Sequence, residues 1–501
     1  MFGILKRLLR FRTKAKMTGS LPPLISVIGA TGTGKSQLAV DLAHALNGEI
    51  VNSDAMQMYA GLPIITNKPT VAEMGGIPHH LLSFLPIDEV YRVGQFVKEA
   101  EKRIEEIRSR GKLPIVVGGT HYYVQSLLFP HSIGTEGEEE YPFLPATGGD
   151  LAIKYPILDS PTPELFAELR RIDPEIAEKW HPNDRRKIRR SLEIYYSTDG
   201  KQTASEVYAA QRAEKEVSRH RNLVFWVHAE AEALKKRLDA RVDKMIDGGM
   251  WAEIEEMKET YDSMEVDMTK GIWQSIGFKE FLPYLQLYDS HQQQQQQEPE
   301  PDPKVVKKLQ AELARVRARC VETMKTATRQ YARTQTRWIR IKLLNALRPP
   351  SHIYLLNSTD PSAVTEAVTN PAITLAEQFL AGGNSSLPDP CSLSALAEEN
   401  LKPKREDFSS RPDLWVKKTC DVCGVTCINE DMWGLHVKSS RHKRLVKKAA
   451  MKEEVEGYIH AKKEERDGKR VELVRVLEKR AEDLAELEIF DEGEVAGAEE
   501  K

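Results

Sequence analysis

The segment of this 501-residue sequence with the clearest chemistry runs from Gly29 to Ser36. It reads Gly29-Ala30-Thr31-Gly32-Thr33-Gly34-Lys35-Ser36 and matches G-x-x-x-x-G-K-[ST], the spacing of a P-loop, whose backbone amides cradle phosphate groups. The lysine of this pattern reaches the outer phosphate, and the hydroxyl that follows it can bind Mg²⁺. We therefore predict an anion-binding loop in which Lys35 contacts phosphate and Ser36 is a magnesium ligand.

The residues on either side of this loop predict the elements that it needs. Residues 24–28 (LISVI) are apolar and β-branched, as in a buried strand, and residues 37–46 carry apolar side chains at helical spacing. A helix that begins directly after the loop adds its partial positive charge to the site. The strand, turn and helix together favour a true P-loop over a chance glycine-rich turn.

Asp54 is the first candidate for acid–base chemistry. It follows a short apolar segment that begins at Glu49, and we read that segment as a second strand ending at Asp54. In a doubly wound sheet, ligands bind at the carboxyl ends of the strands, so Asp54 is expected to face the P-loop. The next apolar strand, residues 113–117, runs into Gly118-Gly119-Thr120 and not into an acidic magnesium ligand. Motor and switch NTPases are therefore disfavoured.

A second constellation lies near the end of the chain. Cys420, Cys423, His436 and His442 have the spacing C-x2-C-x12-H-x5-H of a C₂H₂ zinc site, in which two thiolates and two imidazoles close a tetrahedron around Zn²⁺. Four ligands satisfy zinc, so we expect Cys427 to be a spare thiol. A single isolated finger reads only about three base pairs of DNA, which argues against a sequence-specific transcription factor.

Basic side chains gather in two places although the net charge of the whole chain is −3. Residues 185–190 contain five arginines and lysines, a density that suggests a polyanionic partner or, in the simpler alternative, a solvated helix face. Residues 304–346 are expected to form one long basic helix, with cations from Lys325 to Arg340 broadly on one face.

Composition and termini limit the remaining possibilities. No run of eighteen apolar residues occurs, so we expect no membrane span, and five cysteines are too few for a disulfide framework in a chain of this length. Residues 1–16 hold six Lys/Arg and no acid, which is typical of a mitochondrial presequence or of a basic tail. A second translation start at Met17 would remove this segment, so we expect a mitochondrial form and a cytoplasmic or nuclear form.

These patterns predict an α/β protein: a P-loop NTPase-like parallel sheet with a helical insertion and a small C₂H₂ zinc finger, acting as a monomer. The predicted segments are a basic targeting segment (1–19), the first part of the core (20–130), a helical RNA-binding insertion (131–214), the second part of the core (215–383) with a disordered Gln tract (291–303), a linker (384–410), the finger (411–447), and a charged helix with an acidic tail (448–501).

Several short motifs together resemble the tRNA dimethylallyltransferase (tRNA isopentenyltransferase) family in its eukaryotic form, which carries a finger of this kind. In chain order the matching segments are Gly29–Ser36, Asn52–Gln57, Pro78–Leu82, Val117–Thr120, Asp184–Arg190, Ser275–Phe278 and Thr328–Arg333, and they span about residues 20–380. The resemblance implies transfer of a dimethylallyl group from dimethylallyl diphosphate to N6 of the adenosine just 3′ of the anticodon.

The resemblance also implies roles for individual residues. Asp54 would be the general base, Thr31 would lie near the reacting centre, and Lys35 and Arg241 would neutralise the departing diphosphate together with Mg²⁺. The residues that would contact tRNA are Asp54, Ala55, Met56, Gln57, Thr120, Arg186, Lys187, Ile188, Arg189, Arg190, Gln274, Ser275, Ile276, Gly277, Phe278 and Lys279.

The P-loop by itself leaves two other functions open. A P-loop kinase or an adenylate isopentenyltransferase would act on a free nucleotide and would need neither the insertion nor the finger. A nucleic-acid-binding protein with a vestigial P-loop would bind without turnover. Acceptance of free AMP would indicate the first alternative, and binding without product would indicate the second.

Overall fold

The computed structural model describes residues 21–129, 149–213, 220–297, 303–347, 352–382, 387–402, 416–464 and 479–483. The chain divides into two compact units, one made of Met1–Ala146 with Ala209–Ser410 and the other of Thr147–Tyr208 with Arg411–Lys501. The basic segment 1–16 and the loop 131–148 lie outside the described residues. Among the described helices, none is long and apolar enough to cross a lipid bilayer.

A six-stranded, wholly parallel sheet forms the centre of the first unit, with the strand order β3-β2-β4-β1-β5-β6. The strands are β1 (Pro23–Ile28), β2 (Gly48–Asn52), β3 (His79–His80), β4 (Leu113–Val117), β5 (Arg221–His228) and β6 (His352–Asn357). The predicted strands at 24–28 and 113–117 are confirmed. β2 ends at Asn52, two residues before Asp54.

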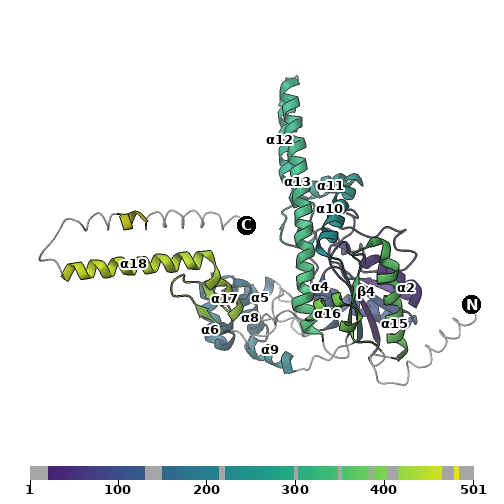
Figure 1. Cartoon of the computed structure of the whole chain (residues 1–501), viewed down its shortest axis with the longest axis horizontal. Coiled ribbons are helices and arrows are strands. Elements are labelled where there is room, and N and C mark those ends of the chain that lie inside the picture. Colours follow the sequence, from purple (N-terminus) through teal and green to yellow (C-terminus); the bar gives the residue numbers. More distant parts are fainter. Residues whose placement is uncertain are drawn as a thin grey trace, which may run out of the picture. The chain divides into compact units, whose positions relative to one another are not determined.

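Alternating side chains of the central strands pack into two separate apolar cores, as expected for a sheet that is buried on both faces. On β1, Leu24 and Ile28 pack into one core, whereas Ile25 and Val27 pack into the other. Helix α3 (Val93–Ser109) closes the first core, and helices α2 (Lys35–Leu46) and α15 (Asn370–Gly382) close the second. Figure 1 shows α2 and α15 beside the sheet.

Two long helices extend from this unit as a hairpin, α12 (Leu282–Gln297) and α13 (Pro303–Trp338) (Figure 1). The prediction of a disordered Gln tract over 291–303 is wrong for Gln292–Gln297, because these residues continue α12. Glutamine is a good helix former, and the packing of α12 on α13 supports the helix. The expected single helix over 304–346 continues from α13 through a π-turn at Ile339–Leu343 into α14 (Leu344–Ala346).

The predicted linker 384–410 is also partly wrong. A short 3₁₀ turn at Pro390–Leu393 and helix α16 (Ala395–Leu401) contact β6, and Ala397 and Leu401 are buried in the first apolar core. Arg340 donates a hydrogen bond to the buried side chain of Asn400. These apolar and polar contacts order a segment whose composition resembles a linker.

The remaining elements of the first unit connect the strands. They are α4 (His121–Leu128), α10 (Ala231–Asp247), α11 (Met250–Ser263), the 3₁₀ turns Met56–Met58, Gly271–Gln274, Lys279–Phe281 and Pro361–Ala363, and the π-turn Thr365–Thr369. In α10, Leu234, Leu238, Val242 and Met245 are buried at helical spacing. The opposite face of α10 carries charged residues that contact the P-loop and α13.

The second unit contains a helical part and the finger. Its helices are α5 (Gly149–Lys154), α6 (Thr162–Ile172), α7 (Pro174–Lys179), α8 (Arg185–Ser197) and α9 (Ala204–Ala213), with a 3₁₀ turn at Pro156–Asp159. The finger consists of the hairpin β7 (Lys418–Thr419) and β8 (Thr426–Cys427), then α17 (Glu430–Lys438) and α18 (Ser440–Glu464). Trp180 is almost wholly buried and donates a hydrogen bond to Ser191, which fixes α8 within the helical part.

Candidate active site

The P-loop follows β1 directly and turns into α2, as the sequence predicts. Gly29 has φ +147°, and a Cβ there would lie 2.2 Å from the carbonyl oxygen of Val227 on β5, so only glycine fits. Gly34 begins α2 in the left-handed conformation, which no bulky residue adopts readily. The loop therefore keeps its tight shape because glycine occupies its most restricted positions.

The side chains of Thr33 and Lys35 curl back over the loop. Thr33 Oγ1 and Lys35 Nζ both donate to the carbonyl oxygen of Ala30, at 2.9 and 2.8 Å. Among the residues that the structure describes, none accepts a hydrogen bond from the backbone amides of Gly32, Thr33 or Gly34. The second half of the loop thus presents N–H groups beside a lysine and a helix N-terminus, a suitable arrangement for an anion.

Arg241 reaches the same loop from α10. Its Nη1 atom donates a hydrogen bond of 2.7 Å to Oγ1 of Thr31. Arg241 is 210 residues away from Thr31 in the sequence, and the structure brings it to the loop that holds Thr31 and Lys35, the residues with which it was predicted to share one site.

Asp54 lies just beyond the end of β2 and faces these cations. The side chain of Asn52 braces this turn, because it accepts from the amide of Asp54 at 3.1 Å and donates to the carbonyl oxygens of Asp54 and Leu81. The Asp54 carboxylate accepts from the amide of Met56 at 3.2 Å. A Cβ on Gly119 would lie 3.1 Å from Oδ2 of Asp54, so the Gly-Gly-Thr loop passes directly beside the carboxylate.

Burial controls the protonation of this cluster more strongly than the attraction between its charges. Asp54 and Lys35 keep some exposed area, but protein atoms surround their charged ends. Burial raises the pKa of Asp54, although Lys35, two backbone amides and Arg241 oppose the rise. Burial likewise lowers the pKa of Lys35 to about 8, against the attraction of Asp54. A carboxyl group with a raised pKa is better suited to accept a proton near neutral pH.

Three further residues of this site were not assigned a role from the sequence. Gln335 on α13 bonds the amide of Thr31 and the carbonyl of Gly119, and His121 at the start of α4 has its Nε2 atom 3.3 Å from the amide nitrogen and 3.2 Å from the oxygen of Gly29. The Tyr331 side chain interacts with Thr120 and Gln335. The one signal in the sequence for this part of α13 was the motif at Thr328–Arg333, which contributed to the family resemblance but assigned no role to any residue.

Burial lowers the pKa of His121 to about 3, with a smaller contribution from the charge of Lys35. The imidazole is therefore neutral at physiological pH. A neutral ring can accept at Nε2 from the amide of Gly29, or donate from Nε2 to its oxygen, depending on the tautomer.

The predicted tRNA contacts are distributed over both units. Ala55, Met56 and Gln57 are partly exposed beside Asp54, and Thr120 Oγ1 accepts from the amide of Ala55 at 3.0 Å. Gln274 and Lys279 are exposed, and Ile276 is partly exposed. Ser275, Gly277 and Phe278 are buried, so any contact of this stretch with RNA would come from its exposed members, and the contact itself stays a prediction.

Helix α8 of the second unit carries Arg186, Lys187, Ile188, Arg189 and Arg190. Ile188 is fully buried and supplies the apolar face that packs α8 within the helical part, so its side chain is not available to RNA in this structure. Arg189 and Arg190 pair with Glu193, and Lys187 lies over the ring of Trp180. Arg186 is exposed.

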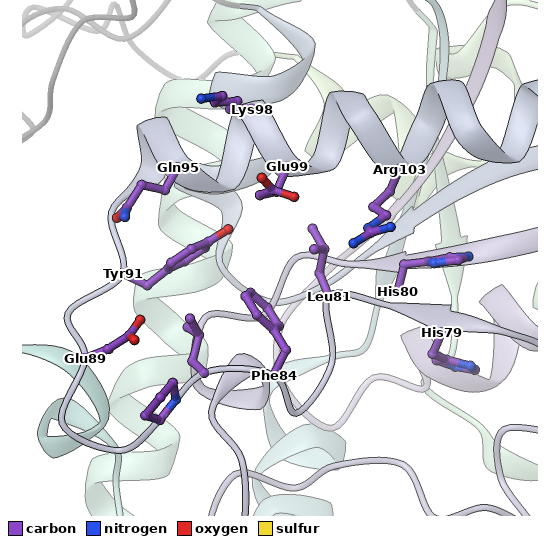
Figure 2. A pocket seen from close by; sticks show the side chains of 12 residues that line it. His79, His80, Leu81, Phe84, Glu89, Tyr91, Gln95, Lys98, Glu99 and Arg103 are labelled. Atoms are coloured by element: carbon purple, nitrogen blue, oxygen red, sulfur yellow. The ribbon is translucent and has the colours of Figure 1, made fainter. Parts of the chain in front are cut away.

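A separate pocket of about 690 Å³ lies between β3, the segment that follows it, and α3. Figure 2 shows Phe84 and Tyr91 on one side of it, with Glu99 and Arg103 reaching in from α3. The pocket does not contain Asp54, but hydrogen bonds of Ser83 and Phe84 to the carbonyls of Gln57 and Met58 tie its wall to the segment beside Asp54.

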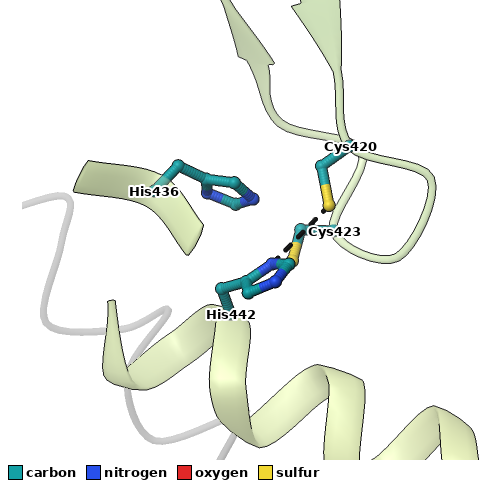
Figure 3. Close-up of side chains that lie close together, drawn as sticks. All are labelled: Cys420, Cys423, His436 and His442. Atoms are coloured by element: carbon teal, nitrogen blue, oxygen red, sulfur yellow. Dashed lines mark hydrogen bonds between the residues drawn. The ribbon is translucent and has the colours of Figure 1, made fainter. Parts of the chain in front are cut away.

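The finger brings its four predicted ligands together. One ligand atom from each of Cys420, Cys423, His436 and His442 lies within 4.8 Å of all the others. The Nδ1 atom of His442 is 3.6 and 3.4 Å from the two sulfurs (Figure 3). Zinc bonds of about 2.0–2.3 Å place tetrahedral ligands about 3.3–3.8 Å apart, so the group fits a metal ion. Cys427 is buried on β8 and is outside this group.

Comparisons with known proteins agree with this geometry. A family model described as IPP transferase matches residues 57–342, and one described as isopentenyl transferase matches residues 23–90. The chain is 37% identical to a tRNA dimethylallyltransferase of Schizosaccharomyces pombe, over 88% of this chain and 98% of the relative. It is 33% identical to the Homo sapiens tRNA dimethylallyltransferase, over 85% and 86%.

A solved structure of a eukaryotic dimethylallyltransferase acting on tRNA is also similar. It is 35% identical, with a TM-score of 0.70, and the match covers 87% of this chain and 99% of that chain. The similarity therefore extends well beyond the P-loop.

Proposed function

Because this chain belongs to the IPP transferase family, we propose that it transfers a dimethylallyl group from dimethylallyl diphosphate to N6 of the adenosine just 3′ of the anticodon in tRNA, and releases diphosphate. The observation that carries the proposal is the meeting of Asp54, Lys35, Arg241 and Thr31 at a P-loop. A carboxylate and fixed cations beside an anion cradle are the groups that this transfer requires.

In the proposed reaction, the N6 lone pair attacks C1 of the dimethylallyl group while the bond from C1 to the diphosphate oxygen breaks. Asp54 takes the proton that N6 loses, which compensates for the weak nucleophilicity of an amine conjugated with the adenine ring. Lys35 and Arg241 neutralise the charge that grows on the leaving oxygen, and the loop amides bind the diphosphate. The target base would be turned out of the anticodon loop and read by residues 54–57.

The exposed hydroxyl of Ser36 in the first turn of α2 would hold Mg²⁺, which would supply positive charge to the bound diphosphate. In the finger, Cys420, Cys423, His436 and His442 would hold a structural Zn²⁺. The Nε2 atom of His436 is buried without a hydrogen-bond partner among the described residues, as expected for a nitrogen that is a metal ligand. Metal analysis of the purified protein tests the zinc.

The decisive experiment is mass analysis of tRNA nucleosides after incubation of the protein with dimethylallyl diphosphate and Mg²⁺. N6-isopentenyladenosine at the adenosine 3′ of the anticodon is the expected product. Prenylation of free AMP at a comparable rate would instead favour the adenylate isopentenyltransferase. Binding of tRNA without any product would favour the protein with a vestigial P-loop.

Two further parts of the proposal concern location and assembly. Translation from Met1 would give a mitochondrial form and translation from Met17 a cytoplasmic or nuclear one, which a fluorescent reporter fused to residues 1–20 tests by its distribution. The protein would act as a monomer, since one chain supplies all the residues that meet at the P-loop, and light scattering of the purified protein tests its mass.

A further inference from the structure

The long helix α13 contacts both sides of the candidate active site through one side chain. Gln335 is 4% exposed, its Oε1 atom accepts from the amide of Thr31 at 2.7 Å, and its Nε2 atom donates to the carbonyl of Gly119 at 2.9 Å. Thr31 belongs to the loop that would hold the diphosphate. Gly119 precedes Thr120, which bonds the segment that would read the target base.

A Cβ on Gly119 would lie 2.5 Å from Nε2 of Gln335, so a larger residue at Gly119 would displace the end of the Gln335 side chain. A primary amide carries an oxygen acceptor and an NH₂ donor, so it can accept from one backbone position and donate to another at the same time. Loss of these two hydrogen bonds would leave the amide hydrogen of Thr31 without its partner, and the carbonyl oxygen of Gly119 with only the bond from the amide of His121.

The same helix also holds the helix that carries Arg241. Arg329 Nη1 lies 2.6 Å from Asp239, and Lys325 Nζ lies 2.7 Å from Asp243. These two aspartates bracket Arg241 on α10, and Arg241 donates to the hydroxyl of Thr31. α13 therefore fixes Thr31 twice, through its amide directly and through its hydroxyl by way of α10.

We propose that Gln335 is a positioning residue that couples the donor and acceptor sides of the active site. When RNA orders the Gly119–Thr120 loop, the amide of Gln335 is held in place, and it in turn holds the backbone amide of Thr31. The P-loop then loses less conformational freedom when the diphosphate binds. Coupling of this kind is reciprocal: the donor must tighten RNA binding by the same factor. The proposal rests on the proposed function, because it assumes that both substrates bind here.

Three variants separate the two halves of the contact. Gln335→Met keeps the length of the side chain and removes both hydrogen bonds. Gln335→Glu keeps an acceptor for the amide of Thr31 but has no donor for Gly119. Gln330→Met is the matched control, since Gln330 lies on the same helix and is exposed. Thermal melting of each variant with the full chain shows whether the fold is retained.

The measurement is the affinity for dimethylallyl thiolodiphosphate, an unreactive donor analogue, with and without saturating tRNA. In the unchanged protein, tRNA should tighten analogue binding by about 5- to 150-fold, the usual range of coupling between two sites. Gln335→Met should weaken binding without tRNA and reduce the coupling factor to about one. Gln335→Glu should lose the coupling, and its negative charge beside the P-loop should also weaken binding without tRNA, whereas Gln330→Met should change neither quantity.

Steady-state kinetics give a second readout. Gln335→Met should raise the KM for the donor and also lower kcat, because Thr31 is misplaced in the bound state as well. A full coupling factor in folded Gln335→Met would overturn the proposal, as would an unchanged protein in which tRNA does not alter analogue affinity. Failure of the unchanged protein to prenylate tRNA would overturn the proposed function instead, and the two failures are therefore distinct.

Discussion

The cations at the P-loop and those on α8 have the same chemistry but very different surroundings. Lys35 and Arg241 are enclosed by protein and donate to uncharged oxygens of the loop, Ala30 O and Thr31 Oγ1. Arg189 and Arg190 on α8 pair with Glu193 three or four residues away, with side chains 37% and 14% exposed. The first arrangement keeps positive charge available for a bound anion, whereas the second shares it with carboxylates of its own unit.

The difference teaches that the density of basic residues in a sequence is a poor guide to their role. Residues 185–190 are the most basic segment, yet part of their charge is neutralised locally. The two buried cations attract little notice by composition, but burial makes their charge act at short range with little screening by salt. We therefore expect substitutions in the core to change the chemical step and substitutions on α8 to change RNA affinity.

The largest effect is expected for Asp54→Asn. This change keeps the size of the side chain but removes the proton acceptor, so the single-turnover rate with both substrates saturating should fall by about 10²–10⁴-fold. Donor and tRNA affinities, measured separately, should stay near their original values. An almost unchanged rate would remove Asp54 as the base, and loss of Mg²⁺ affinity would make it a metal ligand.

Lys35→Met should have the next largest effect. It removes the charge nearest the outer phosphate, so both donor affinity and the rate of diphosphate departure should fall, the rate by about 10²–10³-fold as for the loss of one preorganised donor. Rapid-quench kinetics over a range of donor concentrations separates the two losses. If only KM rose, Lys35 would bind the ground state and contribute nothing specific to the departure of the diphosphate.

Arg186→Ala on α8 should be milder and should act on RNA affinity alone. The KM for tRNA should rise about two- to fivefold, the range of an exposed ion pair, and the dependence of affinity on salt should flatten by about one counterion. Lys201→Ala, an exposed cation of the same unit, is the control. A reduced single-turnover rate at saturating tRNA would break the distinction between the two groups of cations.

The smallest effect concerns a buried group that must stay uncharged. The pKa of His121 is lowered from 6.5 to about 3, so below about pH 6.5 the unfolded chain takes up a proton that the folded chain does not. The contribution of His121 to the free energy of unfolding should therefore be fully present above pH 6.5 and should decline as the pH falls from there toward 3.

His121→Asn should reduce the slope of the unfolding free energy against pH, by an amount that corresponds to at most one proton taken up on unfolding. Urea unfolding at pH 7 and pH 5 measures this slope. His44→Asn, on the exposed face of α2, is the matched control. Equal pH dependence in the His121 variant and the unchanged protein would show that His121 titrates normally.

Local patterns in the sequence predicted the parts of the fold whose causes are local. The P-loop, the apolar strands around it and the ligand spacing of the finger all depend on residues close together in the chain. The Gln tract and residues 387–402 were mispredicted because their order comes from packing on α13 and β6, which composition does not reveal.

The candidate site shows the same limit more sharply. Gln335 contacts Thr31 across 304 residues and His121 contacts Gly29 across 92, and neither pair has a sequence signature. The strand pattern predicted that Asp54 faces the P-loop with Lys35, but Arg241 was added to this site only through family resemblance. Their convergence depends on β2, β1 and β5 ending at one edge of the sheet, which is a property of the strand order.

That strand order has a consequence for the order of synthesis. β1 lies between β4 and β5, so one edge of this apolar strand stays unpaired until residues 221–228 have been made. At about 5–20 residues per second, the ribosome needs about 10–40 s to travel from Ile28 to Arg221. An unpaired apolar strand edge invites wrong pairing, so this interval is when the chain most needs protection. Arg241 and Gln335 emerge later still, and the nascent protein therefore cannot act on tRNA before its long helix has left the ribosome.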